Sequence, residues 1–491
     1  MEKKVKRLIQ HELIFENPIA KKLIGGMAWN IIGTVFSKVF LMIASVITAR
    51  MLGVDKNGEF GVINSTVLMF STFAGLGLGT TATRFVAEYR NTDKMKCGRI
   101  IGMTNLIGII SGIIMAMALV ILAPWLAIQQ LNAPHLASGL MLASIMLITN
   151  TVNTIQISTL SGFEYFKSIA KLSIIQGLMS FPIYVVFTYF LGVNGLIIGY
   201  IIIGCIMLIL YEFENNKIRK MYGIYMDIKN AHKELYIMWK FSLPSMLSNV
   251  MVGPVTWIGN TFITSSVNGY FQIGIFNAAN QWRSVLTFLP TAVGSVILPL
   301  IVANKGNERL EKINILFGWI MVICFAIPIL TAPELISWLY GREFNGFQLN
   351  VSLLIVVLTC CILSYKEGIA RNLVSNNLMW WAFMSNALWG ITFLGILWHI
   401  RVLGAIGIAI AYLISYFITT VVFIPFYIRR GVVHHSLLIS KEIIFMWLAL
   451  LIQTIVTAIT RNIVIRVLAL LFSIYALWLI GKMMTKKTKL S

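Results

Sequence analysis

The sequence predicts an all-α, polytopic membrane protein, and both its composition and its span-length apolar stretches point to it. Hydrophobic residues make up 58% of the 491 residues, only 12% are charged, and the mean hydropathy is +0.84. A soluble globular protein carries about 25% charged residues. A span-length window moved along the chain finds about 14 apolar stretches, each long enough to cross a hydrocarbon core of about 30 Å as a helix. We therefore expect about 14 transmembrane helices.

The expected helices follow one another with short connections. They cover residues 27–49, 60–83, 100–123, 137–160, 169–190, 194–213, 241–264, 272–300, 313–331, 349–371, 378–398, 402–427, 442–460 and 463–481.

The positive charges of the loops predict the topology. If the basic segment 1–26 is cytoplasmic, 30 of the 39 Lys and Arg residues lie inside, six lie outside and three lie within spans. This bias follows the positive-inside rule and places both termini in the cytoplasm. The net charge of +21 is then spread over short loops, where it faces anionic membrane lipids. Nucleic acid is therefore not an expected partner.

A repeat predicts how the spans are grouped. The run at 191–200 matches that at 403–412 at five of ten positions, 212 residues apart, and Gly58-x-Phe60-x3-Asn64 recurs as Gly274-x-Phe276-x3-Asn280 at an offset of 216. Two similar offsets that each enclose six spans predict two six-helix lobes in parallel repeat, a geometry known from transporters. The predicted parts are an N-lobe (27–213), a basic cytoplasmic linker (214–240), a C-lobe (241–427), a cytoplasmic loop (428–441), two extra C-terminal helices (442–481) and a basic cytoplasmic tail (482–491).

The sequence contains no signature of catalysis. It has no phosphate-binding GxxxxGK[ST] loop, no HExxH and no GxSxG. None of its five cysteines forms a CxxC pair, so we expect neither a disulfide framework nor a metal site. The glycines of the run 75–79 lie inside an apolar span, which favours close helix packing over dinucleotide binding. We expect no catalytic residue and no cofactor.

Charged residues within the spans are the strongest functional signal. Lys38 and Arg283 each lie about twelve residues into a span and have no counterpart in the other lobe. A charge at a helix centre costs about 2.5–3.5 kcal/mol unless it faces water or a partner, so we expect both to face a substrate cavity rather than form a structural pair. Lys366, Glu367 and Arg371 cluster in one span and are candidates for an inner gate or coupling site. The alternative is that these cations extend to the membrane surface and that Glu367 neutralises one of them.

The sign of these charges predicts the kind of substrate. Three cations and one carboxylate favour an anionic headgroup, for which arginine supplies paired hydrogen bonds and lysine a point charge. Polar side chains could line a hydrated path for sugar hydroxyls, although asparagine also serves to hold helices together. The candidates for this lining are Asn30, Asn64, Asn249 and Asn280.

Several segments resemble a known family. These are Lys21-Lys22 through Gly33, the turn at 52–61, the basic run after the second span, and Ser161-Gly162-Phe163-Glu164. They resemble polysaccharide flippases, the O-antigen-type exporters of the multidrug/oligosaccharidyl-lipid/polysaccharide exporter superfamily. The resemblance implies alternating access in the cell (cytoplasmic or inner) membrane and an oligosaccharide on a polyprenyl diphosphate as substrate. It also implies that Lys38 and Arg283 face a central cavity.

Other functions remain open at this point. A flippase for lipid II, the peptidoglycan precursor, or a cation-coupled multidrug antiporter of the same superfamily would share the fold. A scaffold for glycosyltransferases would leave the cations within the spans unexplained. If the chain is a polysaccharide flippase, a polysaccharide polymerase and glycosyltransferases are candidate partners.

Overall fold

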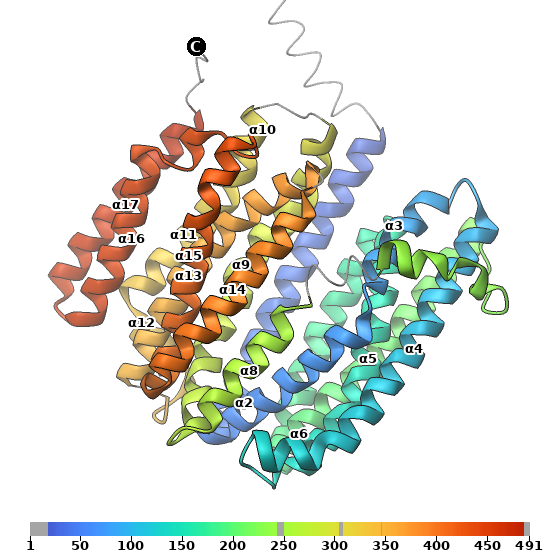
Figure 1. Ribbon diagram of the computed structural model, residues 1–491, viewed down its shortest axis with the longest axis horizontal. Helices are drawn as coiled ribbons and strands as arrows, with labels where there is room; N and C mark the ends of the chain where they lie inside the picture. The colour runs from blue at the N-terminus through green and yellow to red at the C-terminus, as the bar shows by residue number, and fades with distance from the viewer. Residues whose placement is uncertain (1–17, 243–249, 304–307, 345, 377, 486–491) are drawn as a thin grey trace, which may run out of the picture.

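A computed structural model describes residues 18–242, 250–303, 308–344, 346–376 and 378–485. Every regular element in these ranges is a helix, and the helices form two bundles with a further helix pair at one edge (Figure 1). The expected all-α class is confirmed.

The first bundle, which we call the N-lobe, is built from long helices. It comprises α2 (Pro18–Gly75), α3 (Leu78–Tyr89), α4 (Lys94–Trp125), α5 (Leu136–Gly162) and α6 (Phe166–Tyr222), with a π-helical turn at Leu126–Gln130. Short turns at Ala231–Glu234 and Met238–Ser242 lead out of it.

The second bundle, the C-lobe, comprises α8 (Val252–Thr264), α9 (Gly269–Ala303), α10 (Glu308–Lys312), α11 (Gly318–Thr331), α12 (Pro333–Tyr340), α13 (Phe347–Ser375), α14 (Met379–Ile400) and α15 (Gly404–Arg429), with short turns at Ile313–Phe317, Arg401–Leu403 and His435–Leu437. The edge pair is α16 (Lys441–Ile459) and α17 (Ile463–Thr485). The beginning of α2 and the end of α17 lie at the same end of the molecule (Figure 1), which we call the terminal end.

The helices are long and apolar enough to span a membrane. In the described part of the chain, nine helical stretches meet that criterion. Three of them, within 33–75, 166–222 and 380–429, each hold two predicted spans, so the nine account for twelve of the fourteen. The other two coincide with α8 and α9, and part of the seventh span, 243–249, lies outside the described residues. About 14 spans therefore fit the fold.

Glycines bend two helices into hairpins. Gly53 (φ 77°, ψ 175°) bends α2, and Gly192 (φ 58°, ψ −132°) bends α6. Both have backbone angles that residues with a Cβ rarely adopt. Gly404, which the repeat aligns with Gly192, has nearly the same angles (φ 58°, ψ −128°). The matched positions therefore share a backbone conformation, while the exact domain boundaries stay predictions.

The second predicted span, 60–83, is not continuous. Helix α2 ends at Gly75 and α3 begins at Leu78, because Leu76 (φ 44°) and Gly77 (φ 69°) adopt left-handed conformations. A methyl group added to Gly75 would meet no atom within 4 Å, although one at Gly79 would lie 3.0 Å from Ser158 Oγ. Gly79 is therefore closely packed against α5, as predicted, whereas Gly75 lies at the helix break and is not closely packed.

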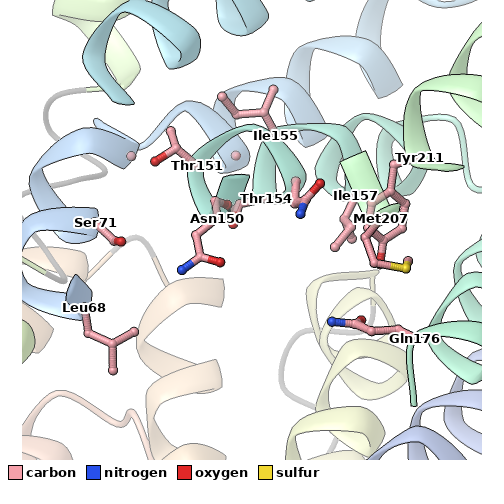
Figure 2. Close-up of a pocket in the computed structure, with 13 residues that line it drawn as sticks. Leu68, Ser71, Asn150, Thr151, Thr154, Ile155, Ile157, Gln176, Met207 and Tyr211 are labelled. Atoms are coloured by element: carbon pink, nitrogen blue, oxygen red, sulfur yellow. Dashed lines mark hydrogen bonds between the residues drawn. The ribbon is translucent and has the colours of Figure 1, made fainter. Parts of the chain in front are cut away.

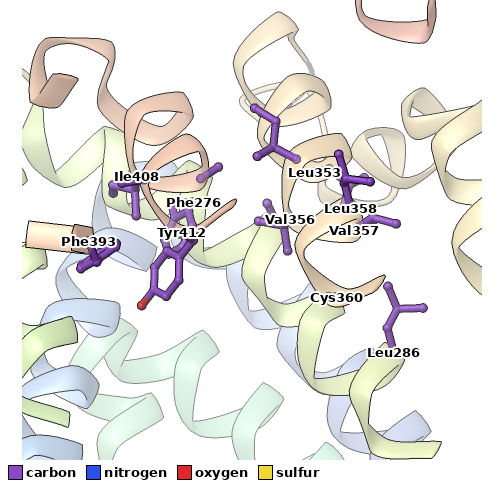
Figure 3. Close-up of a cluster of buried hydrophobic side chains, with 14 of the residues drawn as sticks. Phe276, Leu286, Leu353, Val356, Val357, Leu358, Cys360, Phe393, Ile408 and Tyr412 are labelled. Atoms are coloured by element: carbon purple, nitrogen blue, oxygen red, sulfur yellow. The ribbon is translucent and has the colours of Figure 1, made fainter. Parts of the chain in front are cut away.

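Buried aliphatic and aromatic side chains hold the C-lobe together. A continuous stretch of α13, 353–358, packs toward α9 and α15 (Figure 3). In the N-lobe, the linker lies against α4: the Asp227 amide donates to the Gly98 carbonyl at 3.1 Å, and Arg99 pairs with Glu234 at 2.8 Å. The linker therefore belongs to the folded N-lobe surface.

Candidate functional site: cations on two lobes and a polar pocket in the N-lobe

The two lobes meet closely around Gly53, at the end that we call the Gly53 end. Asn57 Nδ2 donates to the Gly274 carbonyl at 3.2 Å, and the Tyr270 hydroxyl donates to the Leu131 carbonyl at 2.8 Å. A methyl group at Gly58 would collide with the Tyr270 carbonyl. Absence of a side chain at Gly58 thus brings α2 and α9 into direct backbone contact.

Lys38 lies on the first arm of α2. The neighbouring residue, Ser37, packs against Gly177 of α6, where a Cβ would lie only 2.7 Å from the Ser37 Cα. The Lys38 side chain is partly exposed, and no hydrogen bond or ion pair joins it to any residue that the structure describes.

Arg283 lies on α9 beside an aromatic side chain. Its guanidinium sits 5.4 Å from the centre of the Tyr412 ring, and its described neighbours include no carboxylate. The Tyr412 hydroxyl lies 3.2 Å from Thr256 Oγ1, and Figure 3 shows it pointing away from the packed aliphatic side chains. The positive charge of Arg283 is therefore stabilised by a ring face rather than by an anion.

One contact relates the depths of Lys38 and Arg283. Gln281 Nε2 donates to Ser45 Oγ, joining α9 to α2. Lys38 is seven residues from Ser45, or about 10 Å along the helix, and Arg283 is two residues from Gln281, or about 3 Å. Both lie on the terminal side of this contact, so the two cations differ in depth by only about 7 Å.

Lys366 lies in the same aromatic region of the C-lobe. Its Nζ donates to Thr419 Oγ1 at 3.2 Å and to Ser385 Oγ at 3.4 Å, and it sits 5.4 Å from the centre of the Tyr416 ring. The rings of Tyr412 and Tyr416 are 6.3 Å apart. Arg283 and Lys366 therefore flank a tyrosine pair. The sequence signal for this pair is its spacing of four residues, which puts both rings on one helix face.

Arg371 and Glu367 have different surroundings from Lys366. Arg371 donates to the side chain and the carbonyl of Asn314, at 2.6 and 3.0 Å, and lies 3.8 Å from Glu367. Glu367 also accepts from Thr291 Oγ1 at 3.2 Å. Arg371 is thus tied to the body of the C-lobe, whereas Glu367 bridges α13 and α9.

The predicted asparagines have mixed positions. Asn64 and Asn280 are partly buried on α2 and α9. The side chain of Asn30 and the whole of Asn249 lie outside the described residues. Neither Asn64 nor Asn280 lines the cavity that the structure contains in the N-lobe.

That cavity has a volume of about 410 Å³ and lies between α2, α3, α5 and α6. Figure 2 shows the amides of Asn150 and Gln176 pointing into it from α5 and α6. Asn150, Asn153 and Thr154 supply much of its polar lining. Their spacing of three and four residues places them on one helix face, and this spacing is the signal that could have found them.

Comparisons with known proteins identify a family to which this chain is similar. Residues 23–305 match the family model described as polysaccharide biosynthesis protein. The EPS I polysaccharide export inner membrane protein EpsE of Ralstonia nicotianae is 26% identical over 142 residues, which is 28% of this chain and 33% of the relative. The Ralstonia solanacearum EpsE is 26% identical over 139 residues, or 27% of this chain and 32% of the relative. The matches thus span about a third of the relatives' length.

Solved transporters share the fold. The lipid II flippase MurJ in an inward closed conformation matches with a TM-score of 0.65 and 14% identity, covering 92% of this chain and 97% of its own. A mutant of the Vibrio cholerae MATE transporter VcmN matches with a TM-score of 0.62 and 15% identity, covering 84% and 98%. A Pyrococcus furiosus transporter of the MOP superfamily gives 0.61 and 15%, covering 86% and 97%. At these identities the likeness concerns the fold.

Proposed function

Since the chain belongs to the polysaccharide biosynthesis protein family, we propose that it is a flippase for lipid-linked glycans. It moves an oligosaccharide on a polyprenyl diphosphate from the cytoplasmic to the outer leaflet of the cell membrane. The terminal end faces the cytoplasm, because the loops predicted on that side carry 30 of the 39 Lys and Arg residues. The protein acts as a transporter and makes or breaks no covalent bond.

The observation that carries this proposal is a pair of cations on α2 and α9, two helices that bring the lobes into contact. Lys38 and Arg283 come from different lobes, lie at similar depths and have no carboxylate partner among the described residues. A diphosphate would supply the missing negative charge, with paired hydrogen bonds from arginine and a point charge from lysine. The anion would draw the lobes together around it, and release on the opposite side would follow when the Gly53-end contacts open.

Glu367 provides an argument against a drug antiporter. A carrier of organic cations needs a carboxylate that can exchange partners with its substrate. Glu367 instead lies 3.8 Å from Arg371 and accepts from Thr291. We propose that this α13–α9 bridge belongs to the inner gate, with Lys366 next to it, and that the charge of Arg371 keeps Glu367 from acting as a cation site. Polysaccharide polymerase and glycosyltransferases remain candidate partners.

The test is the leaflet position of lipid-linked oligosaccharide in cells that lack the gene, scored with a membrane-impermeant glycan probe. We expect the glycan to accumulate facing the cytoplasm and the wild-type gene to restore outward display. Lys38→Ala and Arg283→Ala should reduce display at least tenfold at normal protein levels. Lys56→Ala, which removes an exposed charge from the turn of the same helix, is the matched control and should restore display fully.

Two results would contradict the proposal. Outward display of the glycan in cells lacking the gene would exclude the flippase function. Full display by both Lys38→Ala and Arg283→Ala would be compatible with the flippase function but would show that these two cations do not bind the substrate.

A further inference from the structure

The N-lobe cavity carries no formal charge. The side chains that line it in the described structure are polar or apolar, with Ser71, Asn150, Asn153, Thr154 and Gln176 among the polar ones. Its volume of about 410 Å³ falls within the range of about 300–1,000 Å³ that is usual for small-molecule sites. A pocket without charge is unsuited to a phosphate or to a cationic drug, and its polar side chains can recognise a ligand by hydrogen bonds.

Two polar atoms of the cavity are shielded from solvent without a partner. Asn153 Nδ2 donates to the Gly204 carbonyl at 3.0 Å, which orients this amide, but its Oδ1 accepts no hydrogen bond from a described residue. Ser71 Oγ has no described partner either. Leaving such an atom unsatisfied costs about 1–3 kcal/mol, and a ligand hydroxyl would remove that cost once the side chain turns to expose the atom to the cavity.

The backbone next to the cavity leaves the helical conformation at the break between α2 and α3. Leu76 has a left-handed conformation (φ 44°), which is unfavourable by about 1–2 kcal/mol for a residue other than glycine. The break separates Gly75 from Gly79, and both line the cavity. Strained backbone of this kind is concentrated at ligand sites, and here it holds two residues without side chains at the cavity wall.

The remaining side chains of the lining suit a sugar ring, which presents hydroxyl groups at its edge and an apolar C–H face. Sugar hydroxyls both donate and accept, and so do the amides of Asn150 and Gln176 and the hydroxyls of Ser71 and Thr154. Tyr211 and Met207 supply apolar surface on another side of the cavity, where the C–H face of a sugar can pack.

We propose that this pocket binds a sugar residue of the transported glycan. This inference rests on the proposed flippase function and assigns to the N-lobe the recognition of the uncharged part of the substrate. The pocket and Lys38 belong to neighbouring helices that are in contact: Gly177 of α6, next to Gln176, packs against Ser37 of α2, which precedes Lys38. The diphosphate is then held by Lys38 and Arg283, while the sugar enters between α5 and α6.

The experiment uses the full chain in lipid nanodiscs and measures calorimetric binding of a soluble probe. The probe is the oligosaccharide that mild acid releases from the lipid-linked glycan of cells lacking the gene, so it carries neither lipid nor phosphate. We expect saturable binding by the wild type and at least tenfold weaker binding by the double variant Asn150→Leu/Gln176→Leu. Gln129→Leu, the same change at an exposed position outside the pocket, should bind like the wild type.

Two further measurements control for misfolding of the double variant and distinguish sugar binding from the proposed flippase function. Gln176→Glu keeps the side-chain shape and should also weaken binding, and inorganic pyrophosphate should not displace the oligosaccharide. No saturable binding by the wild type, unchanged affinity in the double variant and in Gln176→Glu, or displacement by pyrophosphate would overturn the inference. If the glycan-display assay still shows outward transport by the wild type, the flippase function survives that result.

Discussion

At the scale of single residues, the intramembrane cations fall into two kinds. Lys366 is held by two hydroxyls and a tyrosine ring, and Arg283 lies over another ring. A cation–π contact contributes about 0.5–2 kcal/mol but does not neutralise the charge. Arg371, in contrast, has hydrogen bonds and a nearby carboxylate. The first kind can attract a mobile anion, whereas the second stabilises the fold.

The position of Arg371 predicts a stability effect. Asn314 accepts from Arg371 and donates to the Gly368 carbonyl and to Asn372 Oδ1, each at 2.8 Å, so removing the guanidinium leaves a buried amide oxygen unsatisfied. We expect Arg371→Ala to lower the free energy of unfolding by about 2–3 kcal/mol, measured in a denaturant titration of the protein in detergent. Arg342→Ala, at an exposed position, is the control. Equal stability of the two variants would show that the Asn314 contacts contribute nothing.

The sequence was sufficient to locate these cations but not their partners. Lys38, Arg283 and Lys366 stand out because a charge in an apolar span is rare. Tyr412 and Tyr416 do not, because tyrosines are common in membrane helices and only the packing of α15 beside α9 and α13 brings them to the cations. The residues of the N-lobe pocket were missed for the same reason: each is an ordinary polar residue in the sequence, and only the packing of α2, α3, α5 and α6 brings them together.

At the scale of elements, hydropathy predicted the positions of the helices well but did not predict where a helix is broken. The hydropathy of 60–83 is continuous, so it gives no sign that Leu76 and Gly77 leave the helical conformation. The short helix α12 also lies outside every predicted span, because eight residues are too few to cross a membrane. Helix α12 nevertheless has a structural role, since Glu334 pairs with Arg466 of α17 at 2.8 Å.

This pair predicts a pH dependence in the attachment of α17. Burial tends to raise the pKa of Glu334, but hydrogen bonds from Arg466 outweigh it, and the pKa lies below its ordinary value. A lowered pKa stabilises the fold above the unfolded value of about 4.3, and this stabilisation is lost as the pH falls through the folded-state pKa. We expect Glu334→Gln to lower the thermal midpoint at pH 7, and the gap from wild type to narrow below about pH 4.

The partial exposure of Glu334, 36%, keeps this effect modest because solvent screens the pair. Thermal scans of both proteins across the pH range measure the gap. A gap that is the same at pH 7 and at the acid limit would mean that the carboxylate charge has no part in the attachment.

At the scale of the whole molecule, the described contacts between the lobes are closest beside Gly53 and continue along α2 as far as Thr72, which a methyl group at Gly253 of α8 would approach to 2.7 Å. Small residues make this approach possible: methyl groups at Gly58 and Gly61 would collide with Tyr270 and Asn277 of α9. The sequence repeat predicted two lobes with parallel orientation, and the fold agrees. It could not predict which ends of the lobes touch, because that depends on the conformational state rather than on hydropathy.

The central claim is that relative movement of the lobes carries the lipid-linked glycan across the membrane. It is tested most directly by transport in proteoliposomes with Ser45→Cys/Gln281→Cys, at a contact that joins α2 to α9, in a background without the five native cysteines. We predict that a short bifunctional methanethiosulfonate reagent, which crosslinks the two cysteines through reducible bonds, abolishes appearance of the glycan in the opposite leaflet and that reduction restores it. Each single-cysteine variant should transport under both conditions. Undiminished transport by the fully crosslinked protein would contradict the account.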